Sequence, residues 1–334
     1  MIRSDQMDRR FIEEVMAEPG GEHLLTCWSC GTCAATCLVR RFNPAFNPRL
    51  ILHKAGLGLR EAVLSSAEIW ACSACDACYP RCPQGIHISQ VMRAIRNVAI
   101  RAGYEAPGPI AQVDANRCSG CAVCTRICPY EAIERASQNI DGQERVIARV
   151  DRNLCQACGL CVAACPSGAM SLEALNDAEL LTRMAAGGWL EHAGFLQGAS
   201  TTPRLLAFVC QWSVRAEDEW QRIQALNDEH LRVVILPCSG RVEPAHILLA
   251  LSKGVDGVLV MGCHEGECHY QRGTYLGRGK VALLNEMMAQ MGIARERVRF
   301  VESSALERRI FEERLALMRE AILALRPALE IPAR

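Results

Sequence analysis

The sequence of 334 residues predicts a multidomain protein with an all-α domain, a small α+β domain and an α/β domain built on a parallel sheet. Three observations predict these domains and their order along the chain. Cysteines recur in evenly spaced runs through the first half of the chain, and the first runs are joined by segments with helical periodicity. After residue 204, short β-branched runs alternate with helical segments, which is typical of a parallel α/β sheet.

Composition and charge exclude several classes of protein. The chain is 50% hydrophobic and 22% charged, as globular proteins are, and its 37 basic residues balance 37 acidic ones. It therefore has no overall attraction for nucleic acid or anionic lipid. The longest apolar stretch, Ile247 to Cys263, contains Lys253 and Asp256, and the first twenty residues are too charged for a secretory signal. We expect a cytoplasmic protein without a membrane span.

Cysteine is unusually abundant, with 20 residues. In a long chain without an export signal, thiols stay reduced, so metal binding is favoured over disulfides. Sixteen of the cysteines form four runs with the spacing C-x2-C-x2-C-x3-C. The runs are Cys27, Cys30, Cys33 and Cys37; Cys72, Cys75, Cys78 and Cys82; Cys118, Cys121, Cys124 and Cys128; and Cys155, Cys158, Cys161 and Cys165.

This spacing is typical of iron–sulfur ligands. Three thiolates at three-residue steps supply three of the four ligands of a 4Fe-4S cluster, and the fourth comes from elsewhere. Pro83, Pro129 and Pro166 follow the last cysteine of three runs and bend the chain away, whereas Leu38 has this place in the first run. Structural zinc and redox disulfides are the alternatives, but zinc sites normally divide their ligands into two separated pairs. Four identical runs favour iron–sulfur clusters.

The first two runs belong to a helical region. Leu50 to Leu64 is rich in helix formers, and Ile88, Val91, Ile95 and Val98 form one face of a second helix. Residues 24–108 resemble the C subunit of heterodisulfide reductase in the segments CWSCGTC, LSSAEIWAC and AIRNVA, which begin at Cys27, Leu64 and Ala94. The resemblance implies an all-α ferredoxin-like domain over residues 1–107. In two-cluster ferredoxins, the last cysteine of each run ligates the cluster of the other run. By analogy with this crossed ligation, we expect one 4Fe-4S cluster on Cys27, Cys30, Cys33 and Cys82 and another on Cys72, Cys75, Cys78 and Cys37.

The third and fourth runs form an internal repeat. Val113 to Cys118 aligns with Val150 to Cys155 at an offset of 37 residues, and a turn at Ile140 to Gly142 precedes a strand that ends at Val150. Residues 108–175 resemble a bacterial two-cluster ferredoxin, an α+β domain. The resemblance implies a 4Fe-4S cluster on Cys118, Cys121, Cys124 and Cys165, and a second on Cys155, Cys158, Cys161 and Cys128.

A linker is expected over residues 176–203, followed by the C-terminal α/β domain at 204–334. The expected strands are Leu205 to Val209, Val233 to Leu236, Gly257 to Met261 and Val298 to Val301. The expected helices are Glu243 to Lys253, Val281 to Met291, and a helix after the capping box of Ser304 and Glu307, with apolar residues from Ile310 to Leu325.

The four remaining cysteines follow these strands. Cys210, Cys238 and Cys263 each come after a strand, and Cys268 lies in the loop after the third strand. The carboxyl ends of parallel strands share one edge of the sheet, so we expect the four thiols to meet there. Four thiolates suit either a 2Fe-2S cluster or a four-cysteine zinc ion.

The segments Pro237 to Arg241, Gly254 to Val260 and Gly262 to Tyr270 closely resemble the delta subunit of F420-non-reducing hydrogenase. That family carries a 2Fe-2S cluster and links a hydrogenase to heterodisulfide reductase, so the resemblance favours 2Fe-2S over zinc on Cys210, Cys238, Cys263 and Cys268. His264 and His269 suggest Rieske-type ligands as an alternative. Because four cysteines complete the site, we expect these histidines to donate hydrogen bonds near it or to line a docking surface.

The sequence shows no phosphate-binding loop, no glycine-rich turn after the first C-terminal strand and no Cys-Cys-Gly triplet of the kind found in the catalytic subunit of heterodisulfide reductase. We therefore expect an electron-transfer subunit, not catalytic alone, of a heterodisulfide-reductase-like and flavin-based electron-bifurcating complex. Its partners would be flavin-containing reductase A-like and reductase B-like subunits, together with a donor module that is a hydrogenase, a formate dehydrogenase or an NAD(P)H-oxidising module. The alternatives are a self-contained oxidoreductase that uses Cys268, His264 or Glu267, and a cluster-based regulatory sensor.

Overall fold

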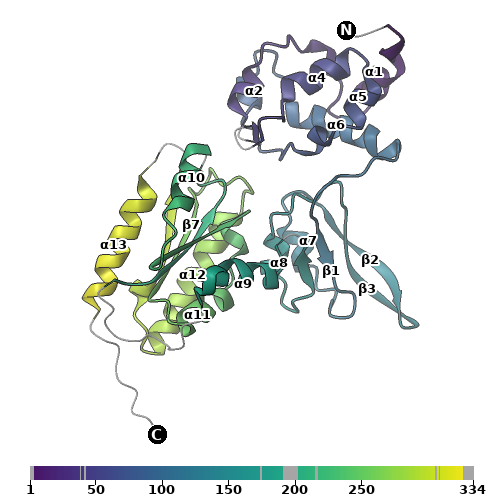
Figure 1. The fold of residues 1–334 in the computed structure, drawn as a ribbon. Helices are drawn as coiled ribbons and strands as arrows, with labels where there is room; N and C mark the ends of the chain where they lie inside the picture. Colours follow the sequence, from purple (N-terminus) through teal and green to yellow (C-terminus); the bar gives the residue numbers. More distant parts are fainter. Residues whose placement is uncertain are drawn as a thin grey trace. The chain divides into compact units, whose positions relative to one another are not determined.

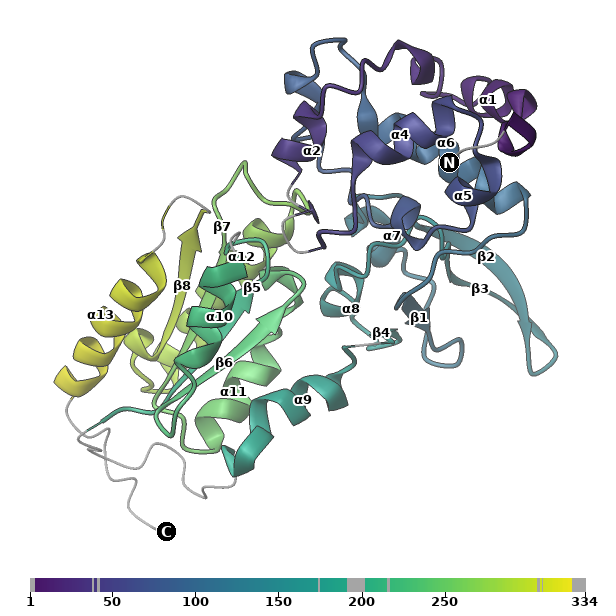
Figure 2. The same cartoon turned by 45° about the horizontal axis from the view of Figure 1, so that its top comes forward.

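The computed structural model describes residues 4–37, 39–40, 43–173, 175–190, 202–214, 217–304, 307 and 309–325. It forms two compact units (Figures 1 and 2). One contains Met1–Gly108 with Arg152–Gln156, and the other contains Pro109–Asp151 with Ala157–Arg334. Within the described ranges, none of the helices combines the length and hydrophobicity that a bilayer crossing requires. Leu38, the residue that replaces proline after the first run, lies outside these ranges.

Every regular element described up to residue 108 is helical, as the sequence predicts. The α-helices are α1 (Arg9–Met16), α2 (Thr32–Thr36), α4 (Pro48–Gly56), α5 (Arg60–Leu64) and α6 (Ile88–Arg101). Short 3-10 turns are η1 (Ser4–Gln6), η2 (Leu24–Thr26), η3 (Ala67–Trp70) and η4 (Tyr79–Arg81).

The single helix expected over residues 50–64 is interrupted at Gly58. Gly58 has φ +72°, and a Cβ atom there would lie 2.6 Å from the carbonyl oxygen of Asp8. The Asp8 N–H also donates to the Gly58 carbonyl oxygen at 2.8 Å. The helix is interrupted between α4 and α5 because only glycine at this position allows the N-terminal segment to approach so closely.

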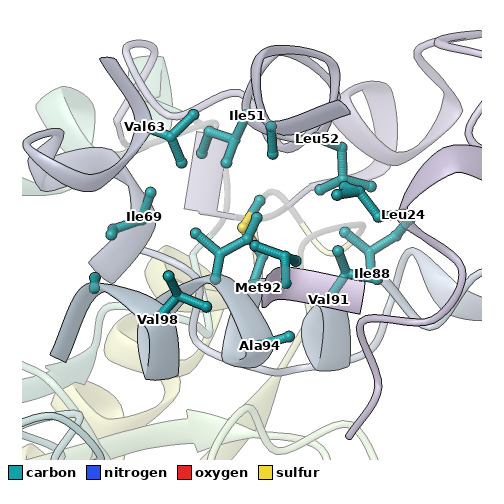
Figure 3. Packing of buried hydrophobic residues seen from close by; sticks show 14 of the residues in the cluster. Leu24, Ile51, Leu52, Val63, Ile69, Ile88, Val91, Met92, Ala94 and Val98 are labelled. Atoms are coloured by element: carbon teal, nitrogen blue, oxygen red, sulfur yellow. The ribbon is translucent and has the colours of Figure 1, made fainter. Parts of the chain in front are cut away.

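The core of the first unit is centred on α6 (Figure 3). The expected face of this helix is confirmed, since Ile88, Val91, Ile95 and Val98 are all buried. They pack with Met92 against side chains from η2, α4, α5 and η3, among them Leu24, Ile51, Leu52, Val63 and Ile69. Cysteines of both runs pack on the edge of this cluster, so the apolar core holds the cysteine loops in place.

The ferredoxin-like part of the second unit repeats one pattern twice. Strand β1 (Ala111–Val113) pairs with β4 (Met170–Leu172), and β2 (Ile133–Ile140) pairs with β3 (Gln143–Val150), both antiparallel. Helices α7 (Val123–Ile127) and α8 (Leu160–Ala163) carry cysteines of the third and fourth runs. The expected turn is confirmed: Asp141 and Gly142 have φ of 51° and 83°, as the tight hairpin between β2 and β3 requires.

Part of the expected linker is a helix. Asn176 caps α9 (Asp177–Ala185) by accepting from the Glu179 N–H at 2.9 Å, and η5 (Ala186–Gly188) follows. Leu180 and Met184 on α9 are fully buried. The cap and the apolar spacing that form this helix are local features of the sequence. Residues 191–201 of the expected linker lie outside the described ranges.

The C-terminal part is the predicted parallel α/β sheet. Its strands are β5 (Leu205–Cys210), β6 (Leu231–Leu236), β7 (Gly257–Cys263) and β8 (Val298–Ser303), in the spatial order β6-β5-β7-β8. Helices α10 (Glu217–Ala225) and α13 (Ile310–Ala324) are joined by an ion pair from Arg222 to Glu312, and α11 (Pro244–Ser252) packs with α12 (Gly273–Gln290) (Figure 2). Short turns η6 (Ser239–Arg241) and η7 (Arg295–Arg297) complete the region.

Two helix boundaries in this region differ from expectation. Helix α12 begins at Gly273 rather than at Val281. Its first turns contain three glycines, whose low helix propensity led the sequence-based prediction to place the start too late. Helix α13 begins at Ile310 with Arg309 at the N-cap, so the expected capping box of Ser304 and Glu307 does not start it. The Glu307 carboxylate nevertheless accepts from the Ser304 N–H at 2.8 Å.

Met92→Ala tests the core of the first unit. Met92 is 0% exposed, and its truncation should cost about 2–5 kcal/mol of unfolding free energy because it leaves a cavity. Leu25→Ala is the control: Leu25 is 57% exposed, so a change within about 0.5 kcal/mol is expected. Urea unfolding under argon, followed by circular dichroism, measures both. Equal losses from the two variants would contradict this packing.

Candidate iron–sulfur sites

One cavity in the first unit brings together cysteines of two runs. It is lined by Cys27, Cys30 and Cys33 of the first run and by Cys82 of the second run. The Ser29 N–H donates to the Cys27 sulfur at 3.4 Å. Burial, then the negative charge of neighbouring thiolates that include Cys82, raises the pKa of the Cys33 thiol to about 11. The last cysteine of the second run thus lies with the first three of the first run.

The other cysteines of this unit gather beside that cavity. Burial raises the pKa of the Cys78 thiol to about 12, with further contributions from the charges of Cys72, Cys75, Cys33 and Cys37. Burial also raises the pKa of Cys37, and nearby Cys72 and Cys75 add to the effect. The Arg96 guanidinium donates to the carbonyl oxygens of Ile69 at 2.7 Å and Cys72 at 2.6 Å, which ties this loop to α6.

A second cavity lies in the ferredoxin-like part. Cys118, Cys121 and Cys124 line it with Cys165 of the fourth run. The Ala169 N–H donates to the Cys165 sulfur at 3.3 Å. In the remaining set, Cys128 ends α7, Cys158 and Cys161 are buried at the start of α8, and Cys155 lies in the segment Arg152–Gln156 that groups with the first unit.

The four C-terminal cysteines meet at the carboxyl edge of the sheet. Cys210 and Cys263 end the adjacent strands β5 and β7, Cys238 is the N-cap of η6, and Cys268 precedes α12. Hydrogen bonds connect the thiols in a ring, in which Cys210 and Cys268 each contact both Cys238 and Cys263. Topology therefore places in one cluster residues that are up to 58 positions apart, from 210 to 268.

The protonation of this ring is uneven. Hydrogen bonds from Cys238 and Cys263 lower the pKa values of Cys210 and Cys268, and the same bonds raise the pKa values of Cys238 and Cys263. A buried set of thiols cannot ionise completely without a compensating positive charge. A metal centre supplies that charge and deprotonates coordinating thiols, so the donor set fits such a centre.

Backbone groups complete the C-terminal site. The N–H groups of Gly240 and Thr274 donate to the sulfurs of Cys238 and Cys268, each at 3.4 Å. The Thr274 hydroxyl donates to the Cys263 carbonyl oxygen at 2.9 Å. A Cβ atom on Gly273 would lie 2.1 Å from the Cys238 sulfur, so glycine is required at the start of α12. Amide donors aimed at sulfur are a recognised means of tuning iron–sulfur potentials.

The two histidines of the C-terminal loop point to different neighbours. His264 contacts Glu307 at 2.7 Å and Glu302 at 3.5 Å, and the hydrogen bond with Glu307 raises the pKa of its imidazole. His269 stacks on Trp212, with ring centroids 3.5 Å apart. Sequence reasoning did not single out Trp212, Tyr270, Gly273 or Arg241, although the first two lie within two residues of a site cysteine.

Comparisons with known proteins agree with these three regions. Residues 23–86 and 99–169 each match a family model for a 4Fe-4S dicluster domain. Residues 205–326 match the family model described as methyl-viologen-reducing hydrogenase, delta subunit. These matches define the class: an iron–sulfur protein that combines two 4Fe-4S dicluster domains with a C-terminal parallel-sheet region.

Individual relatives match separate parts of the chain. The iron-sulfur D subunit of the F420-non-reducing hydrogenase of Archaeoglobus profundus is 39% identical over 112 residues, 33% of this chain and 82% of that protein. The C subunit of the H(2):CoB-CoM heterodisulfide,ferredoxin reductase of Methanothermobacter thermautotrophicus is 37% identical over 107 residues, 32% of this chain and 57% of that protein. The A subunit of the ferredoxin:CoB-CoM heterodisulfide reductase of Methanosarcina mazei is 35% identical over 198 residues, 59% of this chain and 23% of that protein.

Through residues 205–326, the chain belongs to the family of the delta, or iron-sulfur D, subunits of hydrogenases. Its first part is homologous to the C subunits of heterodisulfide reductases, but it spans only a little over half the length of those relatives. The fusion of these parts with a dicluster domain, which the sequence predicts, is confirmed.

Gly273→Ala tests the C-terminal site. The added methyl group should displace the Cys238 sulfur and abolish metal binding at this site alone. Gly279→Ala is a matched control on the same helix, because a Cβ atom there meets nothing within 4 Å. The control should keep its metal and gain about 1 kcal/mol of stability from helix propensity. Metal analysis of both purified variants measures the difference, and full metal binding by Gly273→Ala would contradict the geometry.

Proposed function

We propose that this chain is the electron-transfer subunit of a heterodisulfide-reductase-like complex that carries out flavin-based electron bifurcation. The observation that carries the proposal is that sets of free cysteines, most of them buried or partly buried, occur in every folded part of the chain, including the regions homologous to the reductase C and hydrogenase D subunits. One-electron relay is the chemistry that such sets support when they hold iron–sulfur clusters.

The proposed cofactors are four 4Fe-4S clusters and one 2Fe-2S cluster. In the first unit, the cavity shared by two runs supports ligation by Cys27, Cys30, Cys33 and Cys82, and the neighbouring thiols support Cys72, Cys75, Cys78 and Cys37. In the ferredoxin-like part, the second cavity supports ligation by Cys118, Cys121, Cys124 and Cys165. The resemblance to two-cluster ferredoxins implies the fourth 4Fe-4S cluster, on Cys155, Cys158, Cys161 and Cys128. The thiol ring supports a 2Fe-2S cluster on Cys210, Cys238, Cys263 and Cys268.

The polypeptide contributes binding and tuning. Burial of the thiols and amide donors such as Thr274 N–H set the environment of each centre. Cys33 and Cys78, which belong to different proposed sets, pack on the same apolar cluster of the first unit. This shared packing supports direct electron transfer between the two proposed centres of that unit.

The names of the relatives support a reductase A-like subunit and a hydrogenase among the proposed partners. A flavin-containing reductase A-like subunit would exchange electrons with the chain, a reductase B-like subunit would supply the disulfide site, and a hydrogenase, formate dehydrogenase or NAD(P)H-oxidising module would be the donor. The competing proposal is a self-contained oxidoreductase with a substrate site at Cys268, His264 or Glu267. Engagement of Cys268 with two other thiols of the ring and of His264 with Glu307 favours the relay.

Cys82→Ala tests the crossed ligation. If Cys82 completes the set of the first run, its loss should remove about four iron atoms from that set and spare the cluster of Cys72, Cys75 and Cys78. Cys37→Ala is the matched variant, and it should have the opposite effect. Iron analysis with paramagnetic resonance of the reduced proteins distinguishes the two clusters. Damage by Cys82→Ala confined to its own run would overturn the crossed assignment.

A turnover assay tests the function. The isolated, cluster-loaded chain should accept electrons from dithionite, yet show no disulfide, hydrogen, formate or NAD(P)H turnover, because substrate chemistry needs sites in the partner subunits. Addition of the flavin-bearing and donor partners should start turnover. Sustained turnover by the chain alone would contradict the relay and favour the self-contained oxidoreductase.

A further inference from the structure

Within the second unit, the cysteine segment of α8 lies directly against the C-terminal site. Gly159, the N-cap of α8, has φ +79°, and a Cβ atom there would lie 2.7 Å from Cδ of Arg241. A Cβ atom on Gly240 would lie 2.6 Å from the Leu160 side chain. Gly159 and Leu160 stand between Cys158 and Cys161, and Gly240 lies two residues after Cys238. At each of these two glycines, the absence of a Cβ atom lets a side chain of the other cysteine segment pack directly on the backbone.

Arg241 stabilises the contact between α8 and the loop that carries Cys238. Its side chain is 0% exposed, and its guanidinium donates to Asp177 of α9 at 2.5 Å and to Glu243 at 2.9 Å. It also reaches the Leu175 carbonyl oxygen at 3.5 Å. A buried arginine paired with two carboxylates fixes the geometry of the groups that it joins, because any displacement leaves charge without a partner. The segment that follows the ferredoxin-like part is therefore held to the loop that carries Cys238.

Tyr270 fills the space beside this contact. It is 4% exposed, and its ring lies edge-on to Trp212 and to Tyr130, with both centroid distances 6.2 Å. Tyr130 follows Cys128 and Pro129 of the ferredoxin-like part, whereas Trp212 and Tyr270 each lie two residues after a cysteine of the C-terminal ring. Tyr270 therefore packs between an aromatic residue that follows Cys128 and one that follows Cys210.

The other ferredoxin-like set has different surroundings. The residues that line the cavity of Cys118, Cys121, Cys124 and Cys165 all fall between positions 118 and 170. None of the lining residues described for that cavity comes from the C-terminal sheet or its loops. Among the described residues, the set that contains Cys158 and Cys161 therefore adjoins the C-terminal ring, whereas the set of Cys118, Cys121, Cys124 and Cys165 does not.

Resting on the proposed function, we infer that the set containing Cys158 and Cys161 is the direct redox neighbour of the C-terminal ring, and that Tyr270 is the positioning residue between them. In each transfer, one cluster loses one electron and the other gains it, in the direction that their potentials dictate. No bond forms or breaks and no proton moves. Tyr270 is not oxidised; its ring excludes water and keeps the two sites at a fixed separation.

The test uses paramagnetic resonance of the fully reduced, cluster-loaded full-length chain. Magnetic interaction with its neighbour should broaden the signal of the C-terminal 2Fe-2S cluster. Cys158→Ser should remove the neighbour and sharpen that signal, whereas the matched Cys121→Ser should leave it broad. A signal that sharpens with Cys121→Ser, or is unchanged by Cys158→Ser, would overturn the inference while leaving the proposed function intact. Zinc in place of iron at the C-terminal ring would overturn both.

A second set of variants isolates Tyr270. Tyr270→Leu should retain its iron but slow electron exchange between the two clusters several-fold, measured by freeze-quench paramagnetic resonance, because the ring no longer fills the gap. Tyr270→Phe keeps the ring and should restore the rate. Tyr275→Leu is the control, since Tyr275 is 62% exposed on α12, and it should change nothing. Equal rates in Tyr270→Leu and Tyr275→Leu would show that Tyr270 does not position the sites.

Discussion

The burial of thiols beside apolar cores is the constraint on which the rest of this structure depends. The pKa of Cys33 rises to about 11 and that of Cys78 to about 12, so these groups stay protonated unless positive charge is supplied. Metal binding and folding are coupled in such sites. Helices α2, α7 and α8 have five, five and four residues, which is too short for a helix to be stable in isolation. Metal ligation by the cysteines within and beside them would stabilise these helices.

The crossed arrangement of the cysteines also shapes the chain. Cys82 shares a cavity with the run that begins at Cys27, and Cys165 shares one with the run that begins at Cys118. Each site therefore closes a long loop. Closing the loop costs conformational entropy, but the resulting cross-link stabilises a small domain. In the C-terminal part, the parallel sheet brings distant cysteines together instead, because β5 and β7 are neighbours and place Cys210 beside Cys263.

Much of this architecture could be predicted from sequence, because cysteine spacing, helical periodicity and strand–helix alternation are local signals. The buried face of α6 and the four parallel strands are examples. What sequence reasoning missed depends on contacts between distant segments. Gly58 lies against the backbone of Asp8, Gly273 lies against the Cys238 sulfur, and Arg241 is buried against Gly159 and Asp177. Such close approaches leave no periodic pattern in the sequence.

We propose that each part of the chain holds iron–sulfur centres and that the C-terminal ring holds one of a different type. Mössbauer spectroscopy of the anaerobically loaded full-length chain measures both the number and the type of these centres. We expect about 18 iron atoms per chain, with about one in nine in a 2Fe-2S centre and the rest in 4Fe-4S centres. About 16 iron atoms, all in 4Fe-4S centres, together with one zinc ion would contradict it.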